Sequence, residues 1–398
     1  MEAHLHEWAN LLVRWIHVIT GIAWIGASFY FNWLENNLER EGKAGGIAGN
    51  LWAIHGGGFY FVQKYEVAPG RLPETLHWFK WEAYTTWMSG FALLIIVYYL
   101  NARTTLIDPS VADISPLAAA AIGVATLAVS WFVYDGLCRS PLATRPPLLA
   151  AVGFALLVLL AWALTHVFSG RGAYIHVGAA IGTCMVANVF RVIIPSQKAL
   201  VRAMETGEPR DPALGKNALL RSRHNNYLTL PVLFIMISNH FPSTYGSQWN
   251  WAILAALMLI SAGVRHYFNI RHLPGRKVWI LPTAAVAMAA LAIVTSPSLH
   301  RRLRPAGQSG EDAVTIAQVS AIVSRRCAVC HSANPSFKGF SSPPKGVELD
   351  SPAKIRAHRD RIAQMAVRTH VMPPGNLTHI TSDEREVLAR WVREGHGG

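Results

Sequence analysis

Eight apolar segments fill the first three quarters of this 398-residue chain and constrain its fold more than any other feature. A helix needs about 20 predominantly apolar residues to cross the hydrocarbon core of a bilayer, and several of the segments approach that length. Only 15% of the residues are charged, against about 25% in soluble domains. The sequence therefore predicts an all-α polytopic membrane helix bundle, with about eight transmembrane helices, at approximately 9–34, 81–100, 116–137, 147–168, 172–194, 226–241, 250–268 and 278–296.

The remaining C-terminal part has the ordinary composition of a soluble domain. We therefore divide the chain into a transmembrane domain over 1–298, a linker over 299–312 and a soluble domain over 313–398. The sixth apolar segment is the shortest and contains Pro231, which predicts either a kink or a re-entrant entry into the membrane. Cys138 and Cys184 are isolated in apolar surroundings, so we interpret them as packing residues rather than as a disulfide pair.

The distribution of basic residues predicts the orientation of the helices. Connections one, three, five and seven hold 18 Lys and Arg residues, whereas the N-terminus and connections two, four and six hold Arg103 and Arg171 only. Because cytoplasmic loops carry the excess of basic residues, we predict that the N-terminus and the C-terminal domain are periplasmic. The basic run at 301–304 opposes this orientation but is outnumbered. The polar start Met1–His4 lacks the basic region of a cleavable signal peptide, so we expect none.

The formal net charge of +13 does not indicate a nucleic-acid partner. Nucleic-acid-binding domains gather Lys and Arg on one polar face. Here the basic residues lie between apolar runs, so the partner that the composition predicts is membrane lipid.

The segment Cys327-Ala328-Val329-Cys330-His331 is typical of covalent c-type haem attachment. Its two thiols can each add to one vinyl group of the porphyrin, and the adjacent histidine is then placed to ligate the iron. The alternative is a zinc half-site, which requires further Cys or His ligands at comparable spacing. We predict haem c, held by Cys327, Cys330 and His331.

The second axial ligand is predicted in the loop 371–376. The Pro-Pro-Gly sequence that follows Met372 cannot continue a helix, so the methionine is expected on an irregular loop that faces the iron. Met365 is the competing ligand, and we interpret His370 as a surface histidine. The predicted iron ligands are therefore His331 and Met372.

Apolar residues at helical spacing flank this site and predict two helices. Thr381-Ser382-Asp383 offers an N-cap for the second helix, with Glu384 in its first turn. Over about 310–398 the pattern resembles the class I cytochrome c fold. The apolar positions are Val314, Ile316, Val319 and Ile322 before the motif, and Leu388, Trp391 and Val392 after the loop.

Polar side chains within the apolar segments are costly and indicate function. The alternative for each is a snorkelling or hydrogen-bonded residue at a helix end. Near the periplasmic side lie His17, His166, His176 and His240; near the cytoplasmic side lie Glu82, Asp135, Arg191, His224, Arg265 and His266. We predict that the bundle holds at least one non-covalent b-type haem, because neutral imidazole is a common haem ligand. Its ligands are predicted among His17, His176, His240 and His266, with His17 preferred because it lies in an aromatic, glycine-containing segment. The competing hypothesis is that these histidines bind substrate or move protons.

Several stretches resemble one family over nearly the whole chain. They are Arg14–His17 through Gly21–Gly26, His55–Gly58, Lys80–Tyr84, and Arg221–Tyr227 through Ser238–Pro242. The family is that of the bacterial membrane-bound urate oxidases (urate hydroxylases), an eight-helix membrane domain fused to a C-terminal cytochrome c. The resemblance implies oxidation of urate to 5-hydroxyisourate in the inner membrane. It also implies that electrons leave through the cytochrome to a soluble cytochrome c or terminal oxidase of the respiratory chain, without formation of hydrogen peroxide.

Arginine, amide and aromatic side chains suit a flat, anionic heterocycle such as urate or a similar purine. They cluster at the predicted cytoplasmic mouth of the sixth segment, in Arg223, His224, Asn225, Asn226 and Tyr227, with Trp81 and Glu82 at the mouth of the second. The predicted catalytic residues are Glu82, Arg223, His224, Asn225 and Asn226. The alternative is an ordinary basic and aromatic belt at the membrane interface.

Two other functions are compatible with the sequence. One is a quinol-oxidising or electron-relay subunit without a substrate of its own, and the other is a haem-based sensor or transporter.

The distance between substrate and haem constrains the urate oxidase hypothesis. A urate site at the cytoplasmic mouth lies across a ~30 Å hydrocarbon layer from a periplasmic haem. Either the site lies deep towards the periplasm or intramembrane redox centres bridge the gap.

Overall fold

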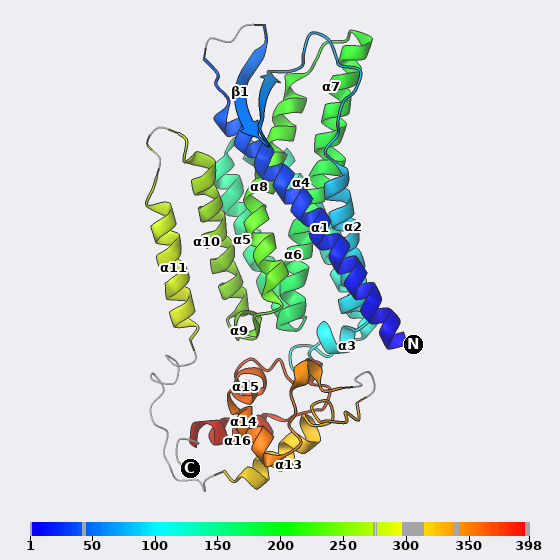
Figure 1. Ribbon diagram of the computed structural model, residues 1–398, viewed down its shortest axis with the longest axis vertical. Coiled ribbons are helices and arrows are strands. Elements are labelled where there is room, and N and C mark those ends of the chain that lie inside the picture. Colours follow the sequence, from blue (N-terminus) through cyan, green and yellow to red (C-terminus); the bar gives the residue numbers. More distant parts are fainter. Residues whose placement is uncertain are drawn as a thin grey trace.

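A helical bundle and a smaller helical lobe lie at opposite ends of the long axis of the protein in the computed structural model (Figure 1). The structure describes residues 2–41, 45–273, 275, 277–296, 314–337 and 342–394. The β-hairpin and α7 lie at the far end of the bundle, whereas α3 and the N-terminus lie at the end next to the lobe. The predicted linker 299–312 is outside the described residues, and the domain boundaries stay a prediction.

Helices occupy all eight predicted segments of the bundle. Their bounds are α1 Glu2–Asn37, α2 Trp81–Leu93, α4 Pro116–Arg139, α5 Pro146–Thr165, α6 Gly170–Ala187, α8 Pro212–Ser238, α10 Asn250–Ile270 and α11 Ile280–Val294. A further helix, α7 (Ile194–Thr206), lies in the connection after the fifth segment. The π-helical turn η1 (Leu94–Tyr99) extends α2, and η3 (Asn188–Ile193) joins α6 to α7. Short helices α3 (Ala102–Thr105), η2 (Pro141–Thr144) and α9 (Pro242–Tyr245) lie in connections.

Five stretches among the described residues are long and apolar enough to cross a membrane. They are His4–Asn37, Pro116–Arg139, Pro146–Thr165, Gly170–Thr206 and Asn250–Ile270. The helix Ile280–Val294 is apolar but shorter. A multi-pass membrane protein is compatible with this architecture, and the count of eight transmembrane helices stays a prediction.

Helix α8 corrects one interpretation of the sequence. It runs without interruption from Pro212 to Ser238 with Pro231 inside it, so a re-entrant entry at this proline is wrong. Asp211 caps the helix by accepting a hydrogen bond from the Ala213 amide at 2.8 Å. The predicted apolar segment covers only the second half of this helix, because the first half is polar. Several polar side chains of the first half are nevertheless buried within the bundle.

A β-hairpin, which the all-α prediction did not include, follows α1. Strands β1 (Ile47–His55) and β2 (Gly58–Tyr65) pair antiparallel, with His55 opposite Gly58. The connecting Gly56 and Gly57 have φ of +58° and +81°. Two successive positive φ values are those of a type I′ turn, which glycine adopts without steric cost. An all-α fold is therefore correct for the bundle and the lobe but wrong for 47–65.

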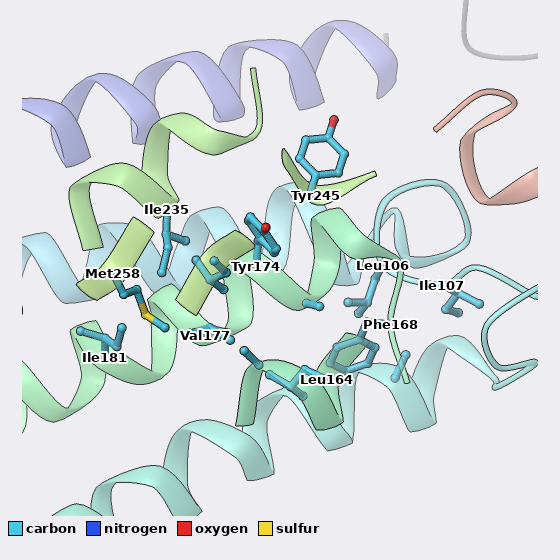
Figure 2. Packing of buried hydrophobic residues seen from close by; sticks show 14 of the residues in the cluster. Leu106, Ile107, Leu164, Phe168, Tyr174, Val177, Ile181, Ile235, Tyr245 and Met258 are labelled. Carbon is cyan, nitrogen blue, oxygen red and sulfur yellow. The ribbon is translucent and has the colours of Figure 1, made fainter. Parts of the chain in front are cut away.

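Helix α6 is the centre of the bundle core (Figure 2). Its buried Tyr174 donates a hydrogen bond to the Asn250 carbonyl at 2.6 Å, which ties α6 to the start of α10. A Cβ at Gly178 would lie 2.5 Å from Cγ2 of Ile235, so glycine permits the close approach of α8. Figure 2 shows the apolar side chains that converge here, among them Leu106, Leu164, Phe168, Val177, Ile181 and Met258.

The lobe has its own apolar core. The lobe consists of α13 (Ile316–Arg326), η4 (Pro344–Gly346), α14 (Pro352–Ala357), α15 (Arg359–Ile362), η5 (Ala363–Arg368), η6 (Pro374–Asn376) and α16 (Ser382–Glu394). The predicted apolar positions of α13 and α16 meet in this core, with Val319, Ile322, Leu388 and Trp391 all buried. The predicted N-cap is confirmed: Thr381 Oγ1 accepts from the Glu384 amide at 3.1 Å, and Glu384 Oε2 accepts from the Thr381 amide at 2.9 Å.

The lobe docks on the bundle through close backbone contacts. A Cβ at Gly375 in η6 would lie 2.0 Å from the Arg103 carbonyl oxygen of α3. At Gly246, just after α9, a Cβ would lie 2.3 Å from Cβ of Thr369. Asp108 of the bundle also acts electrostatically on Arg385 of the lobe. Two glycines therefore set the distance between the two parts.

We predict that Gly375→Ala separates the lobe from α3 and that Gly346→Ala does not. Both glycines have positive φ, +54° and +64°, so both substitutions add backbone strain of about 1–2 kcal/mol. A Cβ at Gly346 meets nothing within 4 Å, whereas one at Gly375 meets the Arg103 carbonyl. Hydrogen exchange of the amides over 102–107 should rise in Gly375→Ala alone. Equal exchange in the two variants would show that this contact does not hold the lobe.

Candidate functional site

The predicted haem-attachment motif forms a tight turn at the end of α13. The amides of Cys330 and His331 donate to the Cys327 carbonyl at 3.1 and 2.9 Å, which brings the three functional side chains together. His331 Nδ1 lies 3.0 Å from the Val347 carbonyl oxygen. Because a carbonyl can only accept, Nδ1 carries the proton and Nε2 presents its lone pair. This is the arrangement of a histidine that ligates a metal.

Arg326 fixes the motif to the start of α16. Its Nε donates to both carboxylate oxygens of Glu384 at 3.1 and 3.0 Å, and its Nη1 donates to the Thr378 carbonyl at 2.6 Å. Thr378 Oγ1 returns a hydrogen bond to the Arg326 carbonyl at 2.8 Å. Burial alone would raise the pKa of Glu384, but hydrogen bonds from Arg326 and the Thr381 amide hold it below its usual range. The carboxylate that anchors the motif therefore stays charged at neutral pH.

Both candidate methionines line the same space as the motif. The Met372 amide donates to the Met365 carbonyl at 2.9 Å, and Arg385 Nη1 donates to the Met372 carbonyl at 3.0 Å. Met365 and Met372 line one cavity together with Cys327, Cys330 and His331. These donors fit a covalently bound haem with a histidine and a methionine ligand, and the preference for Met372 stays a prediction. His370 is exposed, as predicted.

The zinc alternative finds no support. Within the part of the chain that the structure describes, no three or more His, Cys, Asp or Glu side chains gather at a metal site. Burial raises the pKa of the Cys327 thiol to about 11 and also raises that of Cys330. A zinc site requires thiolates, which burial in apolar surroundings disfavours.

The cavity continues from the lobe into the bundle, with a volume of about 2280 Å³. One wall is a polar stripe on α1, formed by His6, Asn10, Arg14 and His17. Residues three or four positions apart lie on one face of a helix, so this stripe points in one direction. Side chains of α2, α6 and α8 complete the lining. The haem motif and polar groups inside the bundle thus share one space.

The structure separates the four histidines named for a non-covalent haem. His17 and His240 line the cavity, and His176 and His266 do not. His17 Nδ1 lies 3.0 Å from the Thr86 carbonyl oxygen, which leaves Nε2 as an acceptor. His176 is fully buried with both ring nitrogens engaged, Nδ1 at 2.8 Å from the Gly172 carbonyl and Nε2 at 3.1 Å from Tyr99 Oη. Among these four, His17 and His240 are placed to meet a ligand in the cavity.

The predicted substrate residues on α8 do not converge. Asn225 lines the cavity and is held by the Met185 carbonyl at 2.9 Å, whereas Asn226 is buried and accepts from Arg265 Nε at 3.0 Å. His224 Nδ1 lies 2.8 Å from Tyr134 Oη. Successive helical residues point about 100° apart, so consecutive positions face different neighbours. The remaining candidates lie outside the cavity lining: Arg223 is exposed, and Glu82 is half-buried at the start of α2.

The most deeply buried charge on α8 is Arg221, which was not among the predicted catalytic residues. Its Nη2 donates to Asp135 Oδ1 at 2.7 Å, and its Nη1 donates to Asn188 Oδ1 at 3.2 Å. The guanidinium lies 5.2 Å from the centre of the Tyr134 ring. This network joins α4, η3 and α8, and it gives the polar first half of α8 a structural role.

We predict that Arg221→Met lowers the free energy of unfolding by about 3–5 kcal/mol, because it leaves Asp135 without its buried partner. Arg139→Met is the matched control. Both arginines lie 2.7 Å from a carboxylate oxygen of Asp135, but Arg221 is 1% exposed and Arg139 is 71% exposed. The exposed pair should contribute at most about 1 kcal/mol. Unfolding by SDS in mixed micelles measures the difference, and equal losses would refute the structural role of Arg221.

A second polar group, which sequence reasoning missed, lies at the lobe end of the cavity. Arg171 Nε donates to Asn239 Oδ1 at 3.2 Å, and Tyr98 Oη donates to the same oxygen at 2.9 Å. The Arg171 guanidinium also lies 5.6 Å from the centre of the Tyr98 ring. The three residues come from α6, η1 and the end of α8, so only the fold brings them together. The sequence feature that could have indicated this group is Arg171 itself, because it is one of only two basic residues on the predicted periplasmic side.

Comparison with known proteins covers the bundle and not the lobe. The family model described as "Urate oxidase N-terminal" matches residues 3–296, which is most of the chain. Searches of curated proteins and of solved structures found no match. The matched region ends at the last described residue of the bundle and contains the whole polar stripe of α1 together with α6 and α8. The chain therefore belongs to the urate oxidase N-terminal family.

Proposed function

We propose that this protein is a membrane-bound urate oxidase that transfers electrons from urate to a c-type haem on its own C-terminal lobe. The observation that carries the proposal is the cavity that joins the Cys327–His331 motif to polar side chains of the family-matched bundle. An electron donor bound in the bundle then reaches the haem edge without leaving the protein. The lobe would be a class I cytochrome c domain in the bacterial periplasm.

The reaction balances without oxygen. Urate and one water give 5-hydroxyisourate, two protons and two electrons. When bound through Cys327 and Cys330, a c-type haem would accept the two electrons one at a time, and a methionine ligand such as Met372 would raise its potential. Electrons then pass to a soluble cytochrome c or a terminal oxidase of the respiratory chain, so hydrogen peroxide is not a product.

The distribution of charge supports the proposed orientation. The connections with the basic excess include the β-hairpin region after α1 and the connection that contains α7. Both lie at the end of the bundle opposite the lobe (Figure 1). The positive-inside rule then assigns the lobe and the N-terminus to the periplasmic side of the inner membrane.

A non-covalent b-type haem in the bundle is part of the proposal. His17 is its best ligand, because its Nδ1 hydrogen bond to the Thr86 carbonyl orients Nε2 as a metal-ligating histidine requires. Gly90 leaves room for this ring, since a Cβ there would lie 3.0 Å from His17 Cε1. His240 also lines the cavity and is the second candidate.

We predict that urate added without oxygen to the purified full-length protein reduces the haem, seen as a rise in its visible α band. The Cys327→Ala/Cys330→Ala variant is the control, and it should lose all haem that survives denaturation and organic extraction. Haem that remains in this variant must be non-covalent, and it should be lost on the further change His17→Ala. Reduction by a quinol but not by urate would replace the enzyme with an electron-relay subunit.

The iron ligand is tested by comparing two methionines that line the same cavity. Met372→Ala should leave the haem covalently attached, lower its midpoint potential and change its sixth-ligand spectrum. Met365→Ala should alter the spectrum little, because we assign Met365 to packing beside the haem. A lowered potential in Met365→Ala alone would reverse the assignment.

A further inference from the structure

The cavity is basic along its lining. Six Lys or Arg residues contribute to it: Arg14, Lys64, Arg171, Arg326, Lys345 and Arg361. Glu35 is the only carboxylate among the described residues of the lining, and it pairs with Arg40 and Lys64 next to the hairpin. At the end near the lobe, Arg326 is paired with Glu384. Arg171, Lys345 and Arg361 form no ion pair with a described residue, so this end keeps an excess of positive charge. A space of this kind attracts an anion.

Arg171 is positioned to bind that anion. It forms no ion pair with any described residue, although it lies in the first turn of a helix of the apolar bundle. An unpaired cation in such surroundings is costly and indicates a function. Asn239 and Tyr98 fix the guanidinium, and its remaining N–H groups can grip a planar anion in a fork. The Tyr98 ring gives the site an aromatic wall.

The site lies next to the haem-binding lobe. Arg171 follows Gly170, where a Cβ would lie 2.0 Å from the Tyr245 carbonyl oxygen of α9. The next residue after α9, Gly246, contacts Thr369 in the chain that leads to Met372. Arg171, Asn239 and Met372 all line the same cavity. A donor bound here does not need to send electrons across the hydrocarbon layer.

We propose, on the basis of the function proposed above, that the urate anion binds at the lobe end of the cavity, to Arg171 beside Asn239 and Tyr98. This places the substrate at the C-terminal end of α8, whereas Arg223 and His224 lie near the middle of that helix. The basic and aromatic residues around Arg223 and His224 then belong to the helix-joining network and the membrane interface.

Anaerobic haem reduction at varied urate concentration tests the site in the full-length protein. Arg171→Gln should raise the urate concentration for half-maximal rate by about 10- to 100-fold, because it removes charged hydrogen bonds to the anion. Arg103→Gln is the matched control, since it removes one positive charge at the same end from an exposed side chain outside the cavity. Haem content and reduction by dithionite should not change in either variant.

The outcomes separate the two proposals. If urate does not reduce the wild-type protein, the proposed function fails. If urate reduces the wild type and Arg171→Gln behaves like Arg103→Gln, the site is wrong while the function stands. Should Arg171→Gln fail to fold, Asn239→Asp replaces it: the new carboxylate would pair with Arg171 and repel urate, with the same increase expected. A normal urate dependence in Asn239→Asp would overturn the site.

Discussion

A polar side chain inside an apolar bundle needs a partner or a cavity, and this requirement organises the protein. Burial of an unpaired charge or polar group costs more than most single contacts return. Arg221 meets the requirement for its terminal nitrogens through Asp135 and Asn188, which ties three elements of the bundle together, while its Nε has no partner among the described residues. Asn226 meets it for Oδ1, which accepts from Arg265 and Asn269 on α10, while its Nδ2 is left without a described partner. These pairs explain why α8 stays helical through a stretch that is too polar to face lipid.

A second class of polar side chains lines the cavity and keeps hydrogen-bonding capacity beyond its protein partners. His17, Arg14 and Arg171 belong to this class: they bond to Thr86, Asn10 and Asn239, and their remaining nitrogens can meet a ligand. The division is physical, because a side chain that is already satisfied gains little from a ligand. It separates structural polar residues from the residues that we propose to bind a ligand, although both kinds occur in the same stretches of sequence.

The lobe and the bundle contribute to one site through close backbone contact. Gly375 against the Arg103 carbonyl and Gly246 against Thr369 allow the two parts to meet without side chains between them. Such contact keeps the Met372 loop at the cavity, where Arg385 also holds its backbone. Short separation is what the proposed electron transfer from the bundle to the lobe requires. The geometry of the proposed haem site would then depend on the docking of the lobe.

The sequence by itself determined the features that depend on local pattern. Apolar length located the helices of the bundle, the Cys327–His331 spacing identified the predicted haem motif, and Thr381 with Glu384 marked the start of α16. Tertiary structure decided what depends on direction and distance. It separated Arg223 to Asn226 onto different faces of α8, carried the helix through Pro231, and joined Tyr98, Arg171 and Asn239 at one point. Sequence order does not encode these contacts, because they arise where side chains from distant helices meet.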